Sequence, residues 1–337
     1  MAIKLAINGF GRIGRLVLRA IIESNRKDVK VIAINDLGTP DSNAHLLQYD
    51  SVHGILPQKV RATKSTINAG KGPIKIFSER NPEDLPWKEL NIDIVMECTG
   101  IFTSKEKAQL HLNAGAKKVL ISAPSNDADI TVVYGVNHNK IRKSHKIISN
   151  ASCTTNCLAP VAKVLNRLCG INQGYMTTVH AFTGDQSLLD VLHSDPRRAR
   201  AASQSIIPSS TGAAKAVGLV LPELQGRLDG TAVRVPTPNV SMIDLVFNAK
   251  KKTDIESINN AMIRASSKEL KGVLAVENKP LVSIDYNHNP HSSIFDLTQT
   301  QVIKGKLGRV LSWYDNEWGF ANRMSDTASV VGKLIKK

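Results

Sequence analysis

Cysteine, aromatic residues and long apolar runs are all scarce in this chain. Four cysteines among 337 residues are too few for a disulfide framework, so we expect all four to be reduced. No apolar run approaches the roughly 20 residues that span a bilayer, and the first residues lack the pattern of a secretion signal. These absences predict a soluble protein of the reducing cytoplasm, with no membrane partner.

Acidic residues are also few, 29 against 44 lysines and arginines, which gives a net charge of +15. A positive charge of this size suits either nucleic acid or small phosphorylated ligands. The basic residues are scattered singly and in pairs, and aromatic residues, at 4% of the chain, form no stripe with them. We therefore expect a generally basic surface and no dedicated nucleic-acid partner, with salt-sensitive RNA binding as the alternative.

A glycine motif follows the first apolar run. Residues 3–8 have the composition of a buried strand, and Gly9, Gly11 and Gly14 then form the pattern G-x-G-x-x-G ahead of a helical pattern. In this context the glycines make a tight turn, let a pyrophosphate approach the backbone and let helix pack on strand. A second apolar run ends at Asp36, where a carboxylate bonds the adenosine ribose and repels a 2′-phosphate. The motif predicts NAD, in preference to NADP, as cofactor.

The pattern of strands and helices predicts an α/β protein of two domains. Strands alternate with helices in the first half, which is typical of a Rossmann-like, doubly wound parallel sheet with its ligand at the carboxyl ends of the strands. The second half is typical of an α+β catalytic domain with a mainly antiparallel sheet. We expect an NAD-binding domain over 1–151, a catalytic domain over 152–317 and a C-terminal helix, 318–337, that packs back on the first domain.

Local patterns place most elements within these domains. We expect a small antiparallel insertion over 59–78, and the helices of the first domain over 42–48 and 104–114. The remaining strands are expected over 92–97, 119–122, 131–134, 174–180, 241–249, 281–286, 293–300 and 309–314.

A polar stretch in the middle of the chain, residues 149–157 (SNASCTTNC), carries a candidate nucleophile. Its Ser, Thr and Asn residues precede apolar residues at helical spacing, so Cys153 is predicted at or near a helix N-terminus. Backbone N–H groups and the helix dipole favour a thiolate there, although a buried, unreactive cysteine is the alternative. His180 ends a later strand, and a Cys and a His distant in sequence are the expected arrangement of an activated thiol.

Three later segments are typical of anion binding. The irregular stretch 184–210 carries a cluster of arginines, although a solvated basic loop is the alternative. Residues 209–215 place hydroxyls and a glycine at a helix entrance. Arg234 lies between apolar strand residues, so it is either paired or directed at a ligand.

Over essentially its full length the chain resembles the phosphorylating glyceraldehyde-3-phosphate dehydrogenase family. The block around Cys153 is highly specific for that family, whereas the glycine motif alone is not. The segment VLHSDP at 191–196 departs from the common family pattern LPHKDL. The matching segments are residues 8–15, 149–157, 197–202, 211–215, 234–238 and 313–319.

The resemblance implies a role for each candidate residue. Cys153 would attack the substrate aldehyde, and His180 would lower the pKa of Cys153 and act as base during hydride transfer. Beside the three glycines, cofactor contacts would come from Arg12, Ile13, Asp36, Arg80, Ser122 and Asn316. Substrate and inorganic phosphate would be held by Ser152, Thr154, Thr183, Arg198, Thr211, Gly212 and Arg234. No metal site is expected.

The implied reaction is the glycolytic oxidation of D-glyceraldehyde 3-phosphate to 1,3-bisphosphoglycerate with NAD and inorganic phosphate. Thiolate addition gives a thiohemiacetal, hydride loss gives a thioester, and phosphate resolves it. The sister enzyme erythrose-4-phosphate dehydrogenase is the alternative, but the hydroxyls near Thr183 and Thr211 favour the triose phosphate. The family is typically a homotetramer, with residues 184–210 near the subunit contacts.

Overall fold

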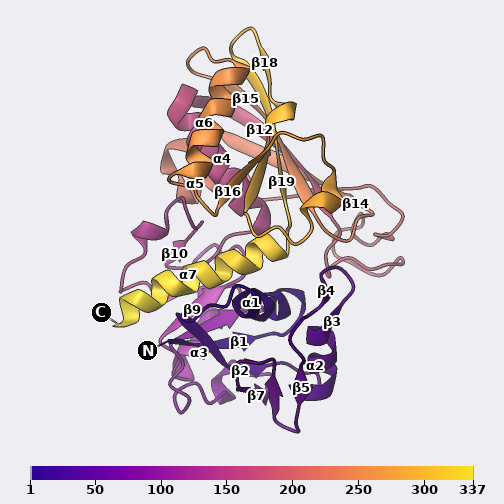
Figure 1. Ribbon diagram of the computed structural model, residues 1–337, viewed down its shortest axis with the longest axis vertical. Helices are drawn as coiled ribbons and strands as arrows, with labels where there is room; N and C mark the ends of the chain where they lie inside the picture. Colours follow the sequence, from indigo (N-terminus) through magenta and orange to yellow (C-terminus); the bar gives the residue numbers. More distant parts are fainter. Residues whose placement is uncertain (1, 337) are drawn as a thin grey trace. The chain divides into compact units, whose positions relative to one another are not determined.

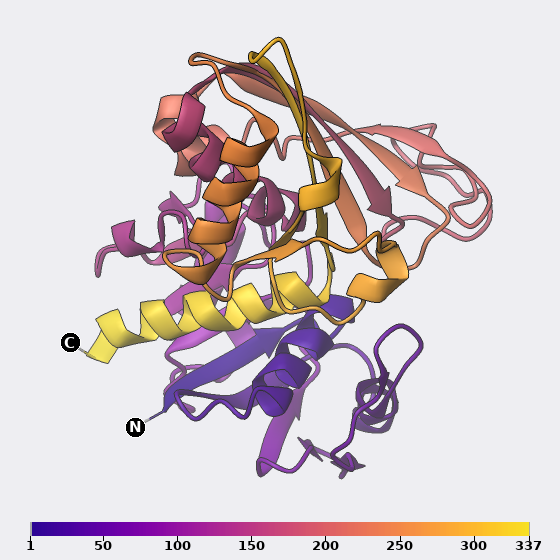
Figure 2. The same cartoon turned by 45° about the horizontal axis from the view of Figure 1, so that its top comes forward.

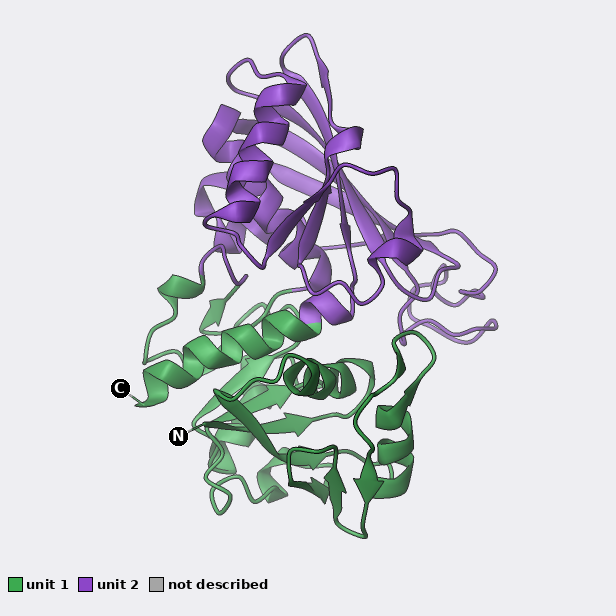
Figure 3. Ribbon diagram, viewed as in Figure 1, with its two compact units in different colours: residues 1–132, 138–151, 321–337 green, residues 133–137, 152–320 purple. Residues whose placement is uncertain are grey.

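The computed structural model describes residues 2–336, which divide into two compact units (Figure 3). The first unit contains the chain up to Val132, the segment His138–Ala151 and the chain from Ala321 onward. The second contains Val133–Asn137 and Ser152–Phe320. Each unit is built around its own large sheet. Among the described residues, no helix has the length and apolar character needed to cross a membrane.

In the described part of the chain, the sheet of the first unit has nine strands. They are β1 (Ile3–Asn8), β2 (Val29–Asn35), β5 (Arg61–Ala62), β6 (Thr66–Asn68), β7 (Pro73–Phe77), β8 (Ile94–Glu97), β9 (Lys118–Ile121), β10 (Ile130–Thr131) and β11 (Ile147–Ser149). Their order is β10-β11-β9-β8-β1-β2-β7-β6-β5, and pairing is parallel from β10 to β7. The last two strands pair antiparallel, as expected for the insertion over 59–78.

Helices accompany this sheet on the way from strand to strand (Figure 1). They are α1 (Arg12–Glu23), α2 (Pro40–Gln48), α3 (Lys105–Asn113) and, from Ala321, the larger part of α7 (Trp318–Lys336); shorter elements are η1 (Pro82–Asp84), η2 (His138–Lys140) and the hairpin β3 (Tyr49–Asp50) and β4 (Gly54–Ile55). Side-chain hydrogen bonds cap the N-termini of α2 and α3. The Thr39 hydroxyl accepts from the N–H of Ser42, and the Ser104 hydroxyl accepts from the N–H of Lys107.

The sheet of the second unit has eight strands. They are β12 (Ile171–Ala181), β13 (Ile207–Ser210), β14 (Leu228–Val235), β15 (Ser241–Ala249), β16 (Leu274–Glu277), β17 (Ser293–Asp296), β18 (Gln301–Ile303) and β19 (Leu307–Tyr314). The order is β13-β14-β12-β15-β19-β17-β16, with β18 on β19. Within residues 2–336, only β12–β14 and β16–β17 are parallel pairs of this sheet. The predicted fold class, a doubly wound parallel sheet plus a mainly antiparallel one, is therefore confirmed.

One face of the second sheet is covered by helices (Figures 1 and 2). These are α4 (Cys153–Cys169), α5 (Val217–Val220) and α6 (Ile255–Ser267). The unit also contains the short turns η3 (Pro222–Leu224), η4 (Ser283–Tyr286) and η5 (Leu297–Gln299). In β12 the buried residues near its end alternate as Met176, Thr178 and His180. This alternation places the His180 side chain on a buried face of the strand.

Three of the expected strands are wrong in whole or in part. Residues 281–286 contain η4 (Ser283–Tyr286) in place of a strand, because the Asp285 carboxylate accepts from the N–H of Val282 at 2.9 Å and closes a turn. The strand expected over 131–134 ends at Thr131, since the N–H of Val133 is bound by the Asn137 side chain. The strand expected over 293–300 ends at Asp296, whose carboxylate caps the following turn.

Candidate active site

The glycine motif forms the turn between β1 and α1. Gly9 has φ +87°, which favours glycine, and a Cβ on Gly14 would lie 2.1 Å from the carbonyl oxygen of Gly9. A Cβ on Gly11, by contrast, would meet nothing within 4 Å. Gly9 and Gly14 are therefore required for packing, whereas Gly11 faces open space at the start of a helix that has no side-chain cap. That uncapped helix start is suited to a phosphate.

A cleft of about 480 Å³ lies beside this turn. It is lined by Asn8, Gly9, Gly11, Asn35, Asp36, Leu37, Glu79, Arg80, Cys98, Thr99, Ile101 and Phe102. These residues place it at the carboxyl ends of β1, β2 and β8, which are neighbours in the parallel part of the sheet. Ligands of doubly wound sheets bind at such ends.

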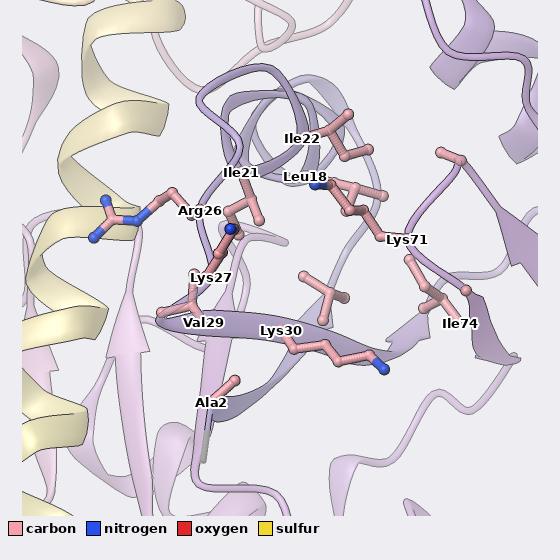
Figure 4. Close-up of a pocket in the computed structure, with 13 residues that line it drawn as sticks. Ala2, Leu18, Ile21, Ile22, Arg26, Lys27, Val29, Lys30, Lys71 and Ile74 are labelled. Carbon is pink, nitrogen blue, oxygen red and sulfur yellow. The ribbon is translucent and has the colours of Figure 1, made fainter.

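A second cavity of the first unit, about 230 Å³, lies at the amino ends of β1 and β2 instead (Figure 4). Its walls include Leu18, Ile21 and Ile22 from α1, and Lys27 and Lys30 lie near the start of β2. The three apolar side chains are at most 5% exposed, so little surface is left for a ligand to cover. This cavity contacts neither the glycine motif nor Asp36 and is separate from the predicted cofactor site.

Asp36 is fixed at the wall of the cleft. One carboxylate oxygen accepts from the N–H of Phe10 at 2.8 Å. The other accepts from the N–H of Gly38 at 2.9 Å and from Asn43 Nδ2 at 3.2 Å. Since a carboxylate has about four acceptor positions, these bonds orient Asp36 and leave it able to accept a further hydroxyl.

The other predicted cofactor residues are distributed over both units. Arg80 lines the cleft with Asp36 and the first two glycines, and Arg12, Ile13 and Gly14 form the first turn of α1. Ser122 directly follows β9, and its N–H donates to the carbonyl oxygen of Glu97 at 2.9 Å. Asn316 belongs to the second unit, where its Oδ1 accepts from Ser241 Oγ at 2.9 Å.

An ion pair holds the Arg12 side chain. Its Nη1 lies 2.6 Å from the Asp50 carboxylate. Burial favours the neutral form of Asp50, but the N–H of His53 and the Arg12 guanidinium outweigh it and lower the pKa of Asp50 to about 2. Arg12 therefore keeps a charged partner at neutral pH.

Several residues that line the cleft were not predicted from the sequence, and Asn8 and Asn35 are two of them. They end β1 and β2 and lie directly opposite each other in the parallel register. The sequence did contain a signal for these two residues, because an asparagine ends each of the two apolar runs.

Cys153 is the first residue of α4, as the sequence predicts. Ser152 is the N-cap, and its Oγ accepts from the N–H of Thr155 at 3.0 Å. The preceding residue, Ala151, has φ +57°, which turns the chain sharply out of the strand before the helix begins. The Cys153 side chain is half-buried.

His180 lies beside this thiol although 27 positions separate the two residues. The distance from Cys153 Sγ to His180 Nε2 is 3.5 Å. On the other side of the ring, His180 Nδ1 is 2.7 Å from the carbonyl oxygen of Ala181, which can only accept. Arg234 Nη1, which can only donate, also lies 3.0 Å from Nδ1, but its two hydrogens have acceptors in the Ala181 carbonyl oxygen and Thr183 Oγ1, each at 3.1 Å. We therefore assign the proton of the neutral ring to Nδ1, which makes Nε2 the basic nitrogen that faces the thiol.

Burial sets the charge of this pair. It raises the pKa of the Cys153 thiol, although the positive charge of Arg234, the Thr154 hydroxyl and the backbone at the start of α4 act to lower it. Burial, with the charge of Arg234, also lowers the pKa of His180 to about 3. The influence that favours a thiolate thus comes from Arg234 and the helix start, and His180 is a neutral base.

Three of the predicted anion ligands, Thr183, Arg198 and Arg234, form one cluster with Asp185 next to His180. Arg234 Nη1 lies 3.0 Å from His180 Nδ1 and donates to Thr183 Oγ1 at 3.1 Å. The Thr183 hydroxyl donates to Asp185, and Asp185 pairs with Arg198 at 3.1 Å. Arg234 Nε is buried and has no hydrogen-bond partner among residues 2–336. Arg198 Nε also lies 3.7 Å from the Asp195 carboxylate, so the two guanidinium groups of the cluster face two carboxylates. The unpartnered Nε of Arg234 is the feature that suits an anionic ligand.

The second group of predicted ligands meets at the start of α4. Thr155 Oγ1 is hydrogen-bonded to Ser152 Oγ at 2.8 Å and donates to the carbonyl oxygen of Ala213 at 3.2 Å. These bonds hold the segment with Thr211 and Gly212 against the helix start. Gly212 is exposed, with nothing within 4 Å of the position of a Cβ. The helix start and this loop together offer hydroxyls and backbone to an anion.

Thr154 differs from the other predicted ligands. Its hydroxyl is buried and hydrogen-bonded to Tyr314 Oη at 2.8 Å. Tyr314 also bonds Thr178 Oγ1 at 2.9 Å and packs edge-on to the His180 ring, with centroids 5.9 Å apart. Tyr314 therefore ties α4 to β12 and supports both members of the Cys–His pair, a role that no local sequence pattern indicated.

Comparison with known proteins gives a consistent result. Two family models match the chain, the NAD binding domain of glyceraldehyde 3-phosphate dehydrogenase over residues 3–105 and its C-terminal domain over 152–316. The glyceraldehyde-3-phosphate dehydrogenase of Xanthobacter flavus is 65% identical over 334 residues, covering 99% of this chain and 100% of that protein. Proteins of the same name from Cereibacter sphaeroides and Geobacillus stearothermophilus are 60% and 54% identical, covering 99% and 98% of this chain and 100% and 98% of theirs.

Proposed function

Because this chain belongs to the glyceraldehyde-3-phosphate dehydrogenase family, we propose that it oxidises D-glyceraldehyde 3-phosphate to 1,3-bisphosphoglycerate with NAD and inorganic phosphate. The observation that carries this proposal is the Cys153 thiol, 3.5 Å from the basic nitrogen of His180 at the start of α4. The cleft at the carboxyl ends of β1, β2 and β8 suits the dinucleotide. The NAD bound there supplies the hydride acceptor.

The first steps follow from the tautomer of His180. Its Nε2 takes the thiol proton as Cys153 Sγ bonds to the aldehyde carbon, and it returns a proton to the new oxygen, giving a thiohemiacetal. When hydride leaves that carbon, Nε2 removes the hydroxyl proton and a thioester remains on Cys153. The bond from Nδ1 to the Ala181 carbonyl oxygen holds the ring in position through each transfer.

Phosphate completes the reaction in the proposed sequence. Its oxygen attacks the thioester carbon, the carbon–sulfur bond breaks, and the Cys153 thiolate leaves. Two phosphate groups are then close to the thiol, one on the substrate and one attacking. We propose that two groups of residues hold them, the cluster of Thr183, Arg198 and Arg234 and the group of Ser152, Thr211 and Gly212. The contacts within each group support a phosphorylating reaction.

Omitting phosphate tests this proposal directly. With glyceraldehyde 3-phosphate, NAD and phosphate, we expect sustained NADH formation, followed by its absorbance. Without phosphate, one equivalent per active site should form and turnover should then stop, because water is a poor substitute for the bound anion. Equally fast sustained turnover without phosphate would contradict the phosphorylating assignment. A higher kcat/KM for erythrose 4-phosphate than for the triose phosphate would favour the alternative enzyme.

Asp36→Asn is expected to relax the preference for NAD. The asparagine oxygen can still accept from the N–H of Phe10, while its NH₂ group then faces the N–H of Gly38, and the negative charge that repels a 2′-phosphate is lost. Two like charges 4 Å apart near a protein surface repel by about 4 kcal/mol. We expect the ratio of kcat/KM for NADP to that for NAD to rise about tenfold, which needs only about 1.4 kcal/mol of that repulsion.

Asp41→Asn is the matched control, because Asp41 is exposed in the first turn of the neighbouring helix α2. Its NADP-to-NAD ratio should equal that of the wild type. An Asp36→Asn variant with an unchanged ratio would show that Asp36 does not contact the adenosine ribose.

A homotetramer is the proposed assembly. The stretch 184–210 exposes Leu188, Leu189, Val191, Leu192 and Ile206. Exposed apolar groups of this density are typical of surfaces that a partner covers. Light scattering should give about four times the chain mass of 36.6 kDa, and a mass of one chain would contradict the proposal.

The proposed location is the cytoplasm. All four cysteines are free in the structure, including Cys157 and Cys169, which are buried. Free thiols are the expected state in a reducing compartment, which supports this location.

A further inference from the structure

Beneath the cofactor cleft, the first unit buries a carboxylate that the reaction does not use. Glu97 ends β8 and is 1% exposed. Its Oε2 accepts from Asn8 Nδ2 at 2.6 Å and lies 3.0 Å from His111 Nε2. Its Oε1 accepts from the N–H of Thr99 at 2.8 Å and from the Thr99 hydroxyl. Glu97 therefore has four donors, which come from three different parts of the chain.

Trp87 determines the tautomer of His111. Its indole Nε1–H, which can only donate, lies 3.1 Å from His111 Nδ1. Nδ1 must therefore accept, so the ring hydrogen of the neutral His111 is on Nε2 and points to Glu97. Both Trp87 and His111 are fully buried. The two rings thus form a rigid support on the side of Glu97 away from Thr99.

The groups bound by Glu97 are the walls of the cleft. Asn8 directly precedes Gly9, and a Cβ on Gly9 would lie 2.7 Å from the backbone nitrogen of Thr99, so these segments are in close contact. Asn8 Oδ1 in turn accepts from Asn35 Nδ2 at 2.7 Å, and Asn35 directly precedes Asp36. Asn8, Asn35 and Thr99 all line the cleft, whereas Glu97 does not.

We propose that Glu97, supported by His111 and Trp87, is a positioning residue for the dinucleotide. It fixes the carboxyl ends of β1, β2 and β8 relative to one another, and with them the glycine turn and Asp36. It contacts no cofactor atom itself. The inference rests on the proposed function, because it assumes that NAD binds in this cleft.

Glu97→Gln tests the proposal with little change of shape. A glutamine has one acceptor oxygen and an NH₂ group. Its NH₂ group must therefore face hydrogen-bond donors that a carboxylate oxygen of Glu97 accepts from in the wild type. We expect the KM for NAD to rise about tenfold, with kcat at saturating NAD and the KM for glyceraldehyde 3-phosphate within about twofold of the wild type. Glu89→Gln, at an exposed position shortly before β8, is the control and should leave all three constants unchanged.

Two variants of His111 separate positioning from general stability. Glutamine can donate to Glu97 and accept from Trp87, so His111→Gln should keep NAD affinity within about threefold of the wild type. Leucine can do neither, so His111→Leu should weaken NAD binding by about tenfold. Affinity is measured by calorimetry without substrate, and His111→Leu also serves if Glu97→Gln does not fold.

The outcomes distinguish this inference from the function on which it rests. A wild-type protein that binds no NAD would refute the proposed cofactor site itself. Unchanged NAD affinity in Glu97→Gln and His111→Leu, with a functional wild type, would overturn the positioning role alone. A fall in kcat or in melting temperature with unchanged KM for NAD would likewise overturn it, because a structural role alone would explain that result.

Discussion

Cys153→Ser should abolish phosphate-dependent NADH formation, with kcat lower by about a thousandfold or more. A serine hydroxyl in the same position forms no thioester, and its much higher pKa leaves no nucleophile at neutral pH. The covalent intermediate gives a second measurement. In the absence of phosphate, mass spectrometry should find one acyl group on the wild-type chain and none on the variant.

Cys157→Ser provides the control on the same helix. Cys157 lies one turn further along α4 and is fully buried, with its Sγ 3.5 Å from Ser293 Oγ and 3.8 Å from the carbonyl oxygen of Ser312. Burial raises the pKa of Cys157 to about 12, so it remains a thiol at neutral pH. This variant should keep kcat within about twofold. Equal losses in the two variants would show that the nucleophile has been assigned to the wrong cysteine.

His180→Asn should lower kcat by about 10²- to 10⁴-fold, the usual contribution of a general base. The amide can still occupy the space beside Arg234 and the Ala181 carbonyl oxygen, but it cannot accept the proton of the thiol or of the thiohemiacetal. Chemistry should then limit turnover, so aldehyde deuterated at the reacting carbon should show a kinetic isotope effect. His45→Asn, at an exposed site on α2, should have no effect on kcat.

The pH dependence follows from the direction of the two pKa shifts. The pKa of Cys153 is raised by burial, so the thiolate fraction of the free protein should increase as the pH rises above the ordinary range of a thiol. Alkylation of Cys153 by iodoacetamide should therefore accelerate with pH in His180→Asn. If kcat of His180→Asn matched that of the wild type, a group other than His180 would have to be the general base.

Local sequence patterns correctly predicted the features that depend on neighbouring residues. The N-cap at Ser152, the helix that starts at Cys153 and the turn at Gly9 all depend on residues that are adjacent in sequence. The prediction of a strand over 281–286 was wrong, although apolar and polar residues alternate there. Val282 and Ile284 are 59% and 72% exposed, and a carboxylate within the same segment closes a turn. A two-residue period could not reveal that competing hydrogen bond.

Contacts between distant residues could not be predicted in the same way. Asn8 and Glu97 are hydrogen-bonded over 89 positions, and Thr154 and Tyr314 over 160. Neither contact has a signature in the neighbouring residues, because the order of the strands in the first sheet creates one and the packing of α4 on β19 creates the other. The charge of the Cys–His pair also escaped prediction, since the start of a helix favours a thiolate while burial, which only the fold reveals, opposes it.

The course of α7 determines when the first unit can finish folding during synthesis. The helix belongs to this unit from Ala321 onward, where Asp326 pairs with Arg26 at 2.5 Å and Gly332 packs on Ile3 so closely that a Cβ would lie 2.1 Å away. The glycine turn leaves the ribosome long before the helix that covers β1, because the second unit is synthesised between them. A nascent chain therefore carries a nucleotide-binding sheet whose first strand stays uncovered until α7 has been synthesised.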